Sequence, residues 1–159
     1  MIALKRVQTC PIGLHLGPRS VTLIQLAGPP EQRSIFAMAY APLPGTDGVA
    51  PADRDRMIVE TIRQLLSGHR FRGGQVVSCL GSEELFLQNV RLPQLPAEEV
   101  DKVVQWEAEE RLPYPVGEAE IRHLVAGEVR QDANIKQEVI LMACHRGVLK
   151  RHVGILEQA

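Results

Sequence analysis

The order of the apolar segments is the feature that most limits how this chain can fold. The first two runs, Ile12–Leu16 and Ser20–Ala27, are rich in Val, Ile and Leu and are joined by Gly17-Pro18-Arg19. Glycine followed by proline is typical of a turn, so the pair predicts a β-hairpin. A third strand is predicted at Ser34–Ala41, before any helix. This order lacks the β-α-β-α alternation of a doubly wound nucleotide-binding sheet and excludes that class.

One helix and one more strand complete a first unit over residues 1–82. The spacing of apolar residues predicts an amphipathic helix over Asp53–Ser67, with Gly68 just past its end as a C-terminal cap. Its apolar face is formed by four residues at the spacing i, i+4, i+7 and i+8: Ile58, Ile62, Leu65 and Leu66. The short apolar run Gln75–Leu80 behind two glycines predicts a buried strand.

A second unit is predicted over residues 83–159, and the whole is an α/β chain of the α+β type. Its predicted elements are the strand Leu85–Leu92, the helix Ala97–Leu112, the strands Ile121–Val129 and Ile135–Cys144, and the helix Gly147–Gln158. The helix Ala97–Leu112 is the clearest, because acidic residues favour its first turn and Pro113-Tyr114-Pro115 ends it. Its expected buried face comprises Val100, Val103, Val104 and Ala108.

Composition excludes several classes of function. The 159 residues carry 18 basic and 19 acidic side chains, which leaves no positive field to attract nucleic acid. The longest apolar run, Val139–Cys144, is far shorter than the roughly 20 residues of a membrane-spanning helix, and no secretory signal is present. Cys10, Cys79 and Cys144 lie far apart in apolar sequence, which favours reduced, mostly buried thiols in a cytosolic protein over a disulfide framework.

Short catalytic and metal-binding motifs are absent from the sequence. It contains no Walker, dinucleotide-binding, HExxH, paired CxxC or GxSxG pattern. His145 and His152 are expected on one helix face, but seven residues apart, whereas zinc-binding histidines on a helix are normally three to five apart. No metal site is therefore predicted.

The glycine-flanked hairpin is the best chemical candidate. Gly13 and Gly17 allow backbone N–H groups to approach a phosphate closely, and Arg19 and Ser20 supply further donors. The alternative is that the glycines only permit a tight turn. Their spacing is a weak signal that favours the turn, and the residues alone leave both interpretations open.

The acidic helix is the other notable segment. Between Glu98 and Glu120 there are eight acidic and two basic residues. Trp106 stands at the edge of the apolar stripe, and Tyr114 is held between two prolines. These two aromatic residues either pack in the core or anchor a partner peptide, and the sequence does not decide between the two.

Several segments of the sequence match the pattern of a known family. The hairpin Ile12–Gly17 with Ser20-Val21 resembles the phosphate-1 segment of actin-like proteins. Four further segments match strings of RLP, LP, WEAE and a turn with two prolines in order and spacing: Val90–Pro93, Leu95-Pro96, Val104–Glu109 and Leu112–Pro115. Together these segments resemble the PilM family, the cytoplasmic actin-like proteins of type IV pilus assembly, and the similarity runs from about Ile12 to the end of the sequence.

This resemblance implies a particular fold. Residues 1–82 correspond to part of an actin-like, ribonuclease-H-like subdomain 1A, and residues 83–159 to an inserted small α+β subdomain 1C of the SHS2 type. The family then returns to subdomain 1A and adds a second lobe. The resemblance therefore implies a truncated chain that lacks half of a nucleotide cleft.

The resemblance also implies a nucleotide loop that has lost its function. In the family an aspartate between the glycines helps to hold the magnesium of ATP, and this chain has His15 there; Pro18 stands in place of a small hydroxyl residue and Thr22 in place of lysine. A neutral imidazole does not replace a carboxylate toward Mg²⁺. We expect no enzyme activity and no cofactor in this chain. The remaining candidate phosphate contacts are Gly13, Gly17 through its N–H, Arg19 and Ser20.

The partners that the resemblance implies are those of a pilus platform. The chain is expected to be a cytoplasmic adaptor at the inner face of the inner membrane, binding the N-terminal peptide of a PilN-like membrane protein and, through the platform, the pilus motor ATPases. The expected peptide contacts are Trp106, Glu107, Pro113, Tyr114 and Pro115. The alternatives are an ATP-binding or slowly hydrolysing actin-like protein and a GspL-like cytoplasmic domain of type II secretion, which the WEAE and PYP strings disfavour.

Overall fold

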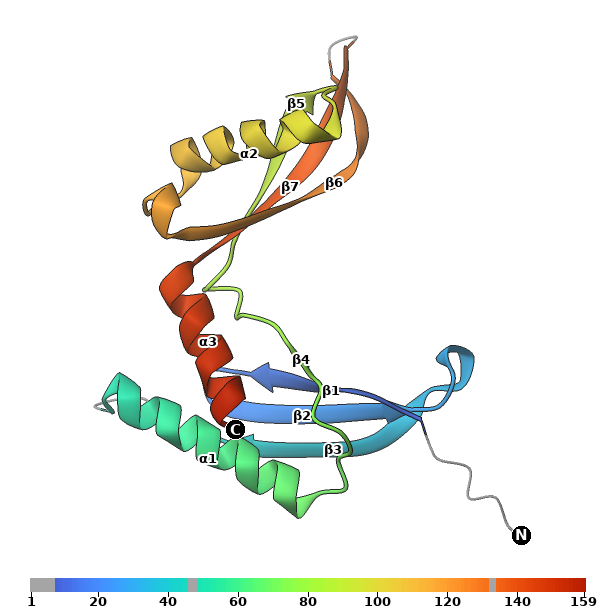
Figure 1. The fold of residues 1–159 in the computed structure, drawn as a ribbon, viewed down its shortest axis with the longest axis vertical. Helices are drawn as coiled ribbons and strands as arrows, with labels where there is room; N and C mark the ends of the chain where they lie inside the picture. Colours follow the sequence, from blue (N-terminus) through green and yellow to red (C-terminus); the bar gives the residue numbers. More distant parts are fainter. Residues whose placement is uncertain (1–7, 46–48, 132–133) are drawn as a thin grey trace. The chain divides into compact units, whose positions relative to one another are not determined.

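The computed structural model describes residues 8–45, 49–131 and 134–159, which form two compact units (Figure 1). The first unit comprises the described residues up to Leu80 together with Val153–Ala159, and the second comprises those of Gly81–His152. The sequence placed the whole of 83–159 in one unit. The structure differs for the last seven residues, because the end of the closing helix packs in the core of the first unit.

The first unit is built on a four-stranded sheet with the order β3-β2-β1-β4. Its strands are β1 Thr9–Leu16, β2 Ser20–Ala27, β3 Ser34–Pro42 and β4 Val76–Ser78, with a short 3-10 helix at Pro30–Gln32. The predicted hairpin is confirmed, since β1 and β2 pair antiparallel with Leu14 opposite Leu23. Strand β4 joins the other side of β1 in parallel.

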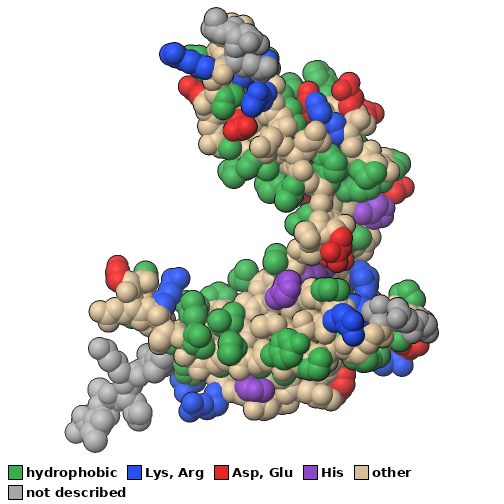
Figure 2. Space-filling model, turned by 180° about the vertical axis from the view of Figure 1, so that it is seen from behind, with side chains coloured by type: hydrophobic (Ala, Val, Ile, Leu, Met, Phe, Trp, Pro, Cys, Tyr) green, Lys and Arg blue, Asp and Glu red, His purple; other side chains and the backbone are tan. Residues whose placement is uncertain are grey.

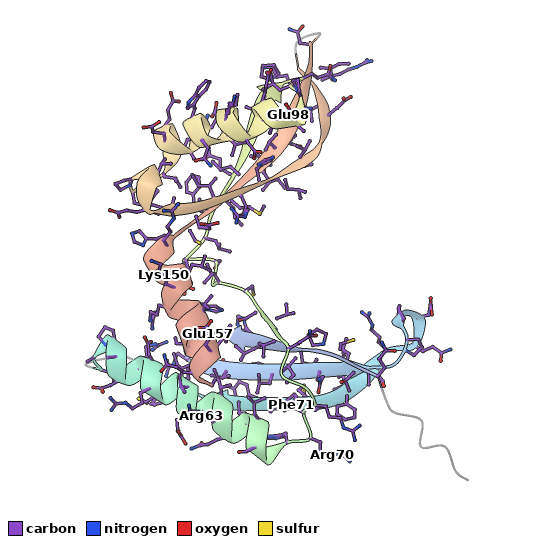
Figure 3. All side chains as sticks on the ribbon, in the orientation of Figure 1. Arg63, Arg70, Phe71, Glu98, Lys150 and Glu157 are labelled. Carbon is purple, nitrogen blue, oxygen red and sulfur yellow. The ribbon has the colours of Figure 1, made fainter. Side chains whose placement is uncertain are left out.

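Helices cover one face of this sheet (Figure 1). The helix α1, Pro51–Gly68, buries Ile58, Val59, Ile62 and Leu65 against the alternate sheet residues Ile12, Leu14, Val21, Leu23 and Ala39. Ile155 near the end of helix α3, Arg146–Gln158, joins the same core, and Arg63 of α1 donates to the carbonyl oxygen of Gln158 (Figure 3). The side chains of Met38, Tyr40 and Val77 are largely exposed, and hydrophobic side chains are visible among charged ones in Figure 2.

The ends of α1 differ from the prediction. The helix starts at Pro51, two residues early, because proline has its φ set for the first turn and lacks the N–H that would be unsatisfied there. It ends at Gly68, and the capping residue His69 has an extended backbone with φ −132°. The prediction that Gly68 lies beyond the helix as a left-handed cap is therefore wrong.

Gln25 of β2 is the one buried polar side chain among the described residues. Its Nε2 donates to the carbonyl oxygens of Cys10 at 2.8 Å and Arg72 at 2.7 Å, and its Oε1 accepts the N–H of Arg72 at 2.9 Å. The amide therefore joins β1, β2 and the segment that leads into β4. Because a buried amide must find partners for both its donor and its acceptor, these three bonds fix the position of that segment.

We expect the substitution Gln25→Leu to lower the free energy of unfolding by about 1–3 kcal/mol, because it leaves the bonded backbone groups of Cys10 and Arg72 without partners. The measurement is urea unfolding followed by circular dichroism. The matched control is Gln105→Leu at an exposed position of the second unit, which should change stability by no more than about 0.5 kcal/mol. Equal stabilities of the two variants would contradict the role of Gln25.

The second unit is a three-stranded antiparallel sheet with the order β5-β7-β6, covered on one face by helix α2 (Figure 1). Its elements are β5 Phe86–Pro93, α2 Ala97–Arg111, a 3-10 helix at Val116–Glu118, β6 Ala119–Gln131 and β7 Asn134–His145. The core joins Val100, Val104 and Ala108 of α2 to alternate strand residues such as Val139 and Leu141. Leu87 and Leu124 point away from this core and are 59% and 56% exposed.

The predicted helix over Ala97–Leu112 is confirmed, one residue shorter at its end. Leu112 has an extended backbone (φ −71°, ψ 140°) because the following Pro113 disfavours the helical region. The N–H of Leu112 still donates to the carbonyl oxygen of Ala108 at 2.9 Å and closes the last turn. Within the described residues, no helix has the length and apolar character needed to cross a membrane.

The three cysteines are free, but they are not all buried. Cys144 is buried and Cys10 is half-buried, as expected from their apolar neighbours, whereas Cys79 is exposed just after β4. Cys79 is therefore the exception to the prediction that the thiols are mostly buried. Its apolar sequence neighbours lie at an edge strand, where Val77 is also 62% exposed.

Candidate functional site

The turn between β1 and β2 is closed by its own backbone. The N–H of Gly17 donates to the carbonyl oxygen of Ser20 at 2.8 Å, and Arg54 of α1 donates to the carbonyl oxygen of Pro18 at 2.8 Å. The N–H of Gly17, a candidate phosphate donor, is therefore already bonded within the turn. Pro18 has no N–H to add.

Packing across the hairpin explains both glycines. A Cβ atom at Gly13 would lie 3.2 Å from Cγ2 of Ile24. A Cβ atom at Gly17 would lie 3.2 Å from Oγ of Ser20 and 3.5 Å from Nε2 of His15. Neither glycine has a positive φ, so each is needed for space and not for an unusual backbone conformation. This geometry supports the interpretation of a tight turn.

A hollow of about 270 Å³ lies beside this hairpin. It is lined by Gly13, Leu14, His15, Thr22, Ile24, Val77, Ser78 and Cys79. Of the four candidate phosphate contacts, Gly13 lines this hollow, whereas Gly17, Arg19 and Ser20 do not. No carboxylate lines the hollow, and the described residues contain no cluster of three or more His, Cys, Asp or Glu side chains that could hold a metal ion.

The second candidate region is helix α2 and the turn after it. Trp106 is 66% exposed, whereas Val100, Val104 and Ala108 on the opposite side of the helix are buried. Of the two interpretations of Trp106, core packing is therefore excluded. The acidic character of the helix extends from Glu98 in its first turn to Glu110 (Figure 3).

Tyr114 has the opposite environment. It packs against the core of the second unit, and its ring meets the imidazole of His145 edge-on with centroids 5.4 Å apart. Burial raises the pKa of the Tyr114 hydroxyl, and the nearby Cys144 adds to this increase. Tyr114 thus anchors the turn to its own unit.

The other residues of the predicted peptide site divide in the same way. Glu107 accepts hydrogen bonds from Arg111 at 2.8 Å and 2.6 Å, an ion pair across one helical turn, and its side chain is 25% exposed. Pro113 and Pro115 are exposed. Of the five residues, Trp106 and the two prolines are free to meet another molecule, while Glu107 and Tyr114 are engaged within the unit.

His145 has a role that the sequence did not reveal. It is the last residue of β7 and not part of the closing helix, so the prediction of a helix face shared with His152 is wrong. Its Nδ1 accepts the N–H of Gly147 at 3.0 Å, so Nε2 carries the proton and donates to Oε2 of Glu118 at 3.0 Å. Arg146 donates to the carbonyl oxygen of Gly117 at 3.0 Å. These bonds hold the start of α3 against the 3-10 helix.

His152 on α3 is the histidine with a perturbed pKa. Burial lowers the pKa of its imidazole, Arg151 adds to the decrease, and Glu84 opposes it. In the same unit, burial raises the pKa of the Cys144 thiol, and the nearby Glu120 and Glu84 add to this increase. Both groups are therefore held in their neutral forms.

We expect the free energy of unfolding to fall as the pH falls below about 6.5, the ordinary pKa of histidine. The unfolded chain binds a proton at His152 more readily than the folded chain does, so acid favours unfolding. The variant His152→Gln should show a smaller loss between pH 7.5 and 5.5, measured by urea unfolding. Lys150→Gln, an exposed change on the same helix, is the control. An unchanged slope in His152→Gln would contradict the prediction.

The four-stranded sheet with its leading hairpin and the α+β unit match part of an actin-like fold. Among solved structures, the chain is similar to PilM in the PilM–PilN type IV pilus biogenesis complex, with a TM-score of 0.77 and 23% sequence identity. It is also similar to the cytoplasmic domain of EpsL, an inner-membrane component of the type II secretion system of Vibrio cholerae, with a TM-score of 0.54 and 14% identity. The predicted resemblance is thereby confirmed at the level of the fold.

These similarities cover 94% of this chain in both cases. The chain spans 44% of the length of the PilM chain and 52% of that of the EpsL domain, about half of each. No protein-family model and no curated protein matches the sequence.

Proposed function

We propose that the protein is a non-catalytic adaptor of a type IV pilus assembly platform. The observation that carries this proposal is the similarity to PilM, with a TM-score of 0.77 over 94% of the chain. That PilM was solved in a complex with PilN. The protein would accordingly work in the cytoplasm, held at the inner membrane through its partners.

The geometry of the β1–β2 turn supports an adaptor over an enzyme. The N–H of Gly17 is bonded to Ser20, Pro18 lacks an N–H, and His15 stands where the resemblance expects a magnesium-binding carboxylate. The turn thus offers a phosphate little beyond the side chains of Arg19 and Ser20.

The proposed ligand is the cytoplasmic N-terminal peptide of a PilN-like membrane protein, and the motor ATPases would be reached through the platform. The proposed contacts are those of the sequence analysis: Trp106, Glu107, Pro113, Tyr114 and Pro115. Their exposed members, Trp106, Pro113 and Pro115, would meet the peptide directly, and Glu107 and Tyr114 would hold the helix and the turn in place.

Isothermal titration calorimetry of the chain with that peptide tests the proposal. We expect saturable binding with a dissociation constant near the micromolar range, or about −8 kcal/mol. Replacing an exposed contact, Pro115→Ala, should weaken binding by about 1 kcal/mol. Pro44→Ala at an exposed position of the first unit is the matched control and should not weaken it. No heat of binding at concentrations well above micromolar would refute the proposal.

An ATP-binding, slowly hydrolysing protein is the second candidate, favoured by the actin-like fold and the glycine hairpin. The adaptor proposal predicts an unchanged thermal midpoint with Mg-ATP, whereas a ligand at 100 times its dissociation constant adds about 2.7 kcal/mol of stability. A clear upward shift would favour the ATP-binding candidate. A shift gained only in the variant His15→Asp would show that the loop lacks one carboxylate.

A type II secretion component is the third candidate, favoured by the similarity to the EpsL domain. Its TM-score of 0.54 is lower than the 0.77 for PilM. The same calorimetry with the pilus peptide separates the two, since a secretion component has no need to bind it.

A further inference from the structure

The exposed indole of Trp106 is unusual for this chain, because it is the sole tryptophan and two-thirds of its surface faces solvent. Helix α2 already buries its apolar stripe of Val100, Val104 and Ala108 against the sheet. Trp106 therefore contributes little to the core of its own unit. A rigid aromatic side chain of this size is the type that most often anchors a protein partner.

The surroundings of Trp106 are acidic. Helical spacing places Lys102 and Val103 one turn before it and Glu109 and Glu110 one turn after it. The helix carries six acidic residues and two basic ones, and one of the basic residues, Arg111, is already paired with Glu107. Asp101 faces His123 at 3.4 Å. Within the part of the chain that the structure describes, Glu99, Glu109 and Glu110 are exposed and form no ion pair.

An aromatic face with unpaired carboxylates one helical turn after it suits one kind of side chain in particular. A guanidinium group stacks on an indole through a cation–π contact and pairs in the same plane with a carboxylate. The chain uses such a contact within its first unit, where Arg72 lies 5.1 Å from the ring centroid of Phe36. Among the described residues, no cation is placed over the ring of Trp106.

We propose that the outer face of α2 around Trp106, Glu109 and Glu110 binds a partner protein segment that presents arginine side chains. An acidic face repels nucleic acid and anionic lipid, so neither is its occupant. This inference goes beyond the proposed function, because it rests on the surface of α2 alone and holds whichever complex the protein joins.

The test uses the 159-residue chain and three short peptides that contain no aromatic residue: one rich in arginine, one with lysine in place of arginine, and one with glutamine. Because Trp106 is the sole tryptophan, its emission reports binding at this face directly. We expect a saturable change with the arginine peptide, a smaller one with the lysine peptide and none with the glutamine peptide. The response to arginine should weaken at high salt, which screens exposed charges.

Variants locate the site, with binding followed by the anisotropy of the dye-labelled arginine peptide. Trp106→Leu keeps the apolar bulk and removes the ring face, and it should weaken binding about two- to five-fold. Glu110→Gln should weaken binding and reduce its salt dependence, whereas Glu31→Gln, an exposed change in the first unit, should do neither. All four proteins should have the same circular dichroism spectrum, since the three changes lie at exposed positions.

Several results would overturn the inference. One is an unchanged Trp106 emission with the arginine peptide, and another is unchanged affinity in Trp106→Leu. An equal response to the glutamine peptide would show that binding at this face does not depend on a positive charge. A change of emission with protein concentration alone would show that a second copy of the chain covers it. The two proposals share Trp106 as a contact, and other residues tell them apart: Glu110→Gln should weaken binding of only the arginine peptide, and Pro115→Ala binding of only the PilN-like peptide.

Discussion

The buried amide of Gln25 is the interaction on which the first unit depends. Strand β4 reaches its place beside β1 only after the chain has passed through helix α1, and that connection has no hairpin to guide it. The side chain of Gln25 holds the connection at Arg72 and holds β1 at Cys10. The bond from the N–H of Ile12 to the carbonyl oxygen of Gln75 then sets the parallel register. The hollow beside the hairpin, which has walls from both β1 and β4, is a consequence of this arrangement.

In the hairpin, backbone groups that the sequence suggested as ligand contacts form hydrogen bonds within the protein instead. Two glycines with an arginine and a serine have the composition of an anion site, yet the space at each glycine is occupied by a neighbouring side chain. The polar backbone of the turn is bonded to Ser20 and to Arg54 of α1. A pattern of residue types is therefore weaker evidence of binding than the count of donors left over after folding.

Local patterns predicted the elements well, and long-range packing explains what they missed. The period of 3.6 residues in Val100, Val104 and Ala108 and the proline after Leu112 were enough to place α2. The same pattern could not orient Trp106, because it lies at the edge of the stripe where either environment fits. The burial of Gln25 and the exposure of Cys79 depend on strands that are distant in sequence. The division of α3 between the two units likewise cannot be predicted from local sequence patterns.

That split has a consequence for how the chain can be divided. Helix α3 follows β7 without a connecting loop. Its first turns belong to the second unit, whereas Ile155 and Leu156 near its end pack in the core of the first. The first unit is thus assembled from two separate stretches of sequence, with the whole second unit inserted between them. A fragment that ends at Leu80 therefore lacks side chains of its own core, among them Ile155. An exchange of the second unit between related proteins would therefore need two junctions with the first unit, one before Gly81 and one after His152.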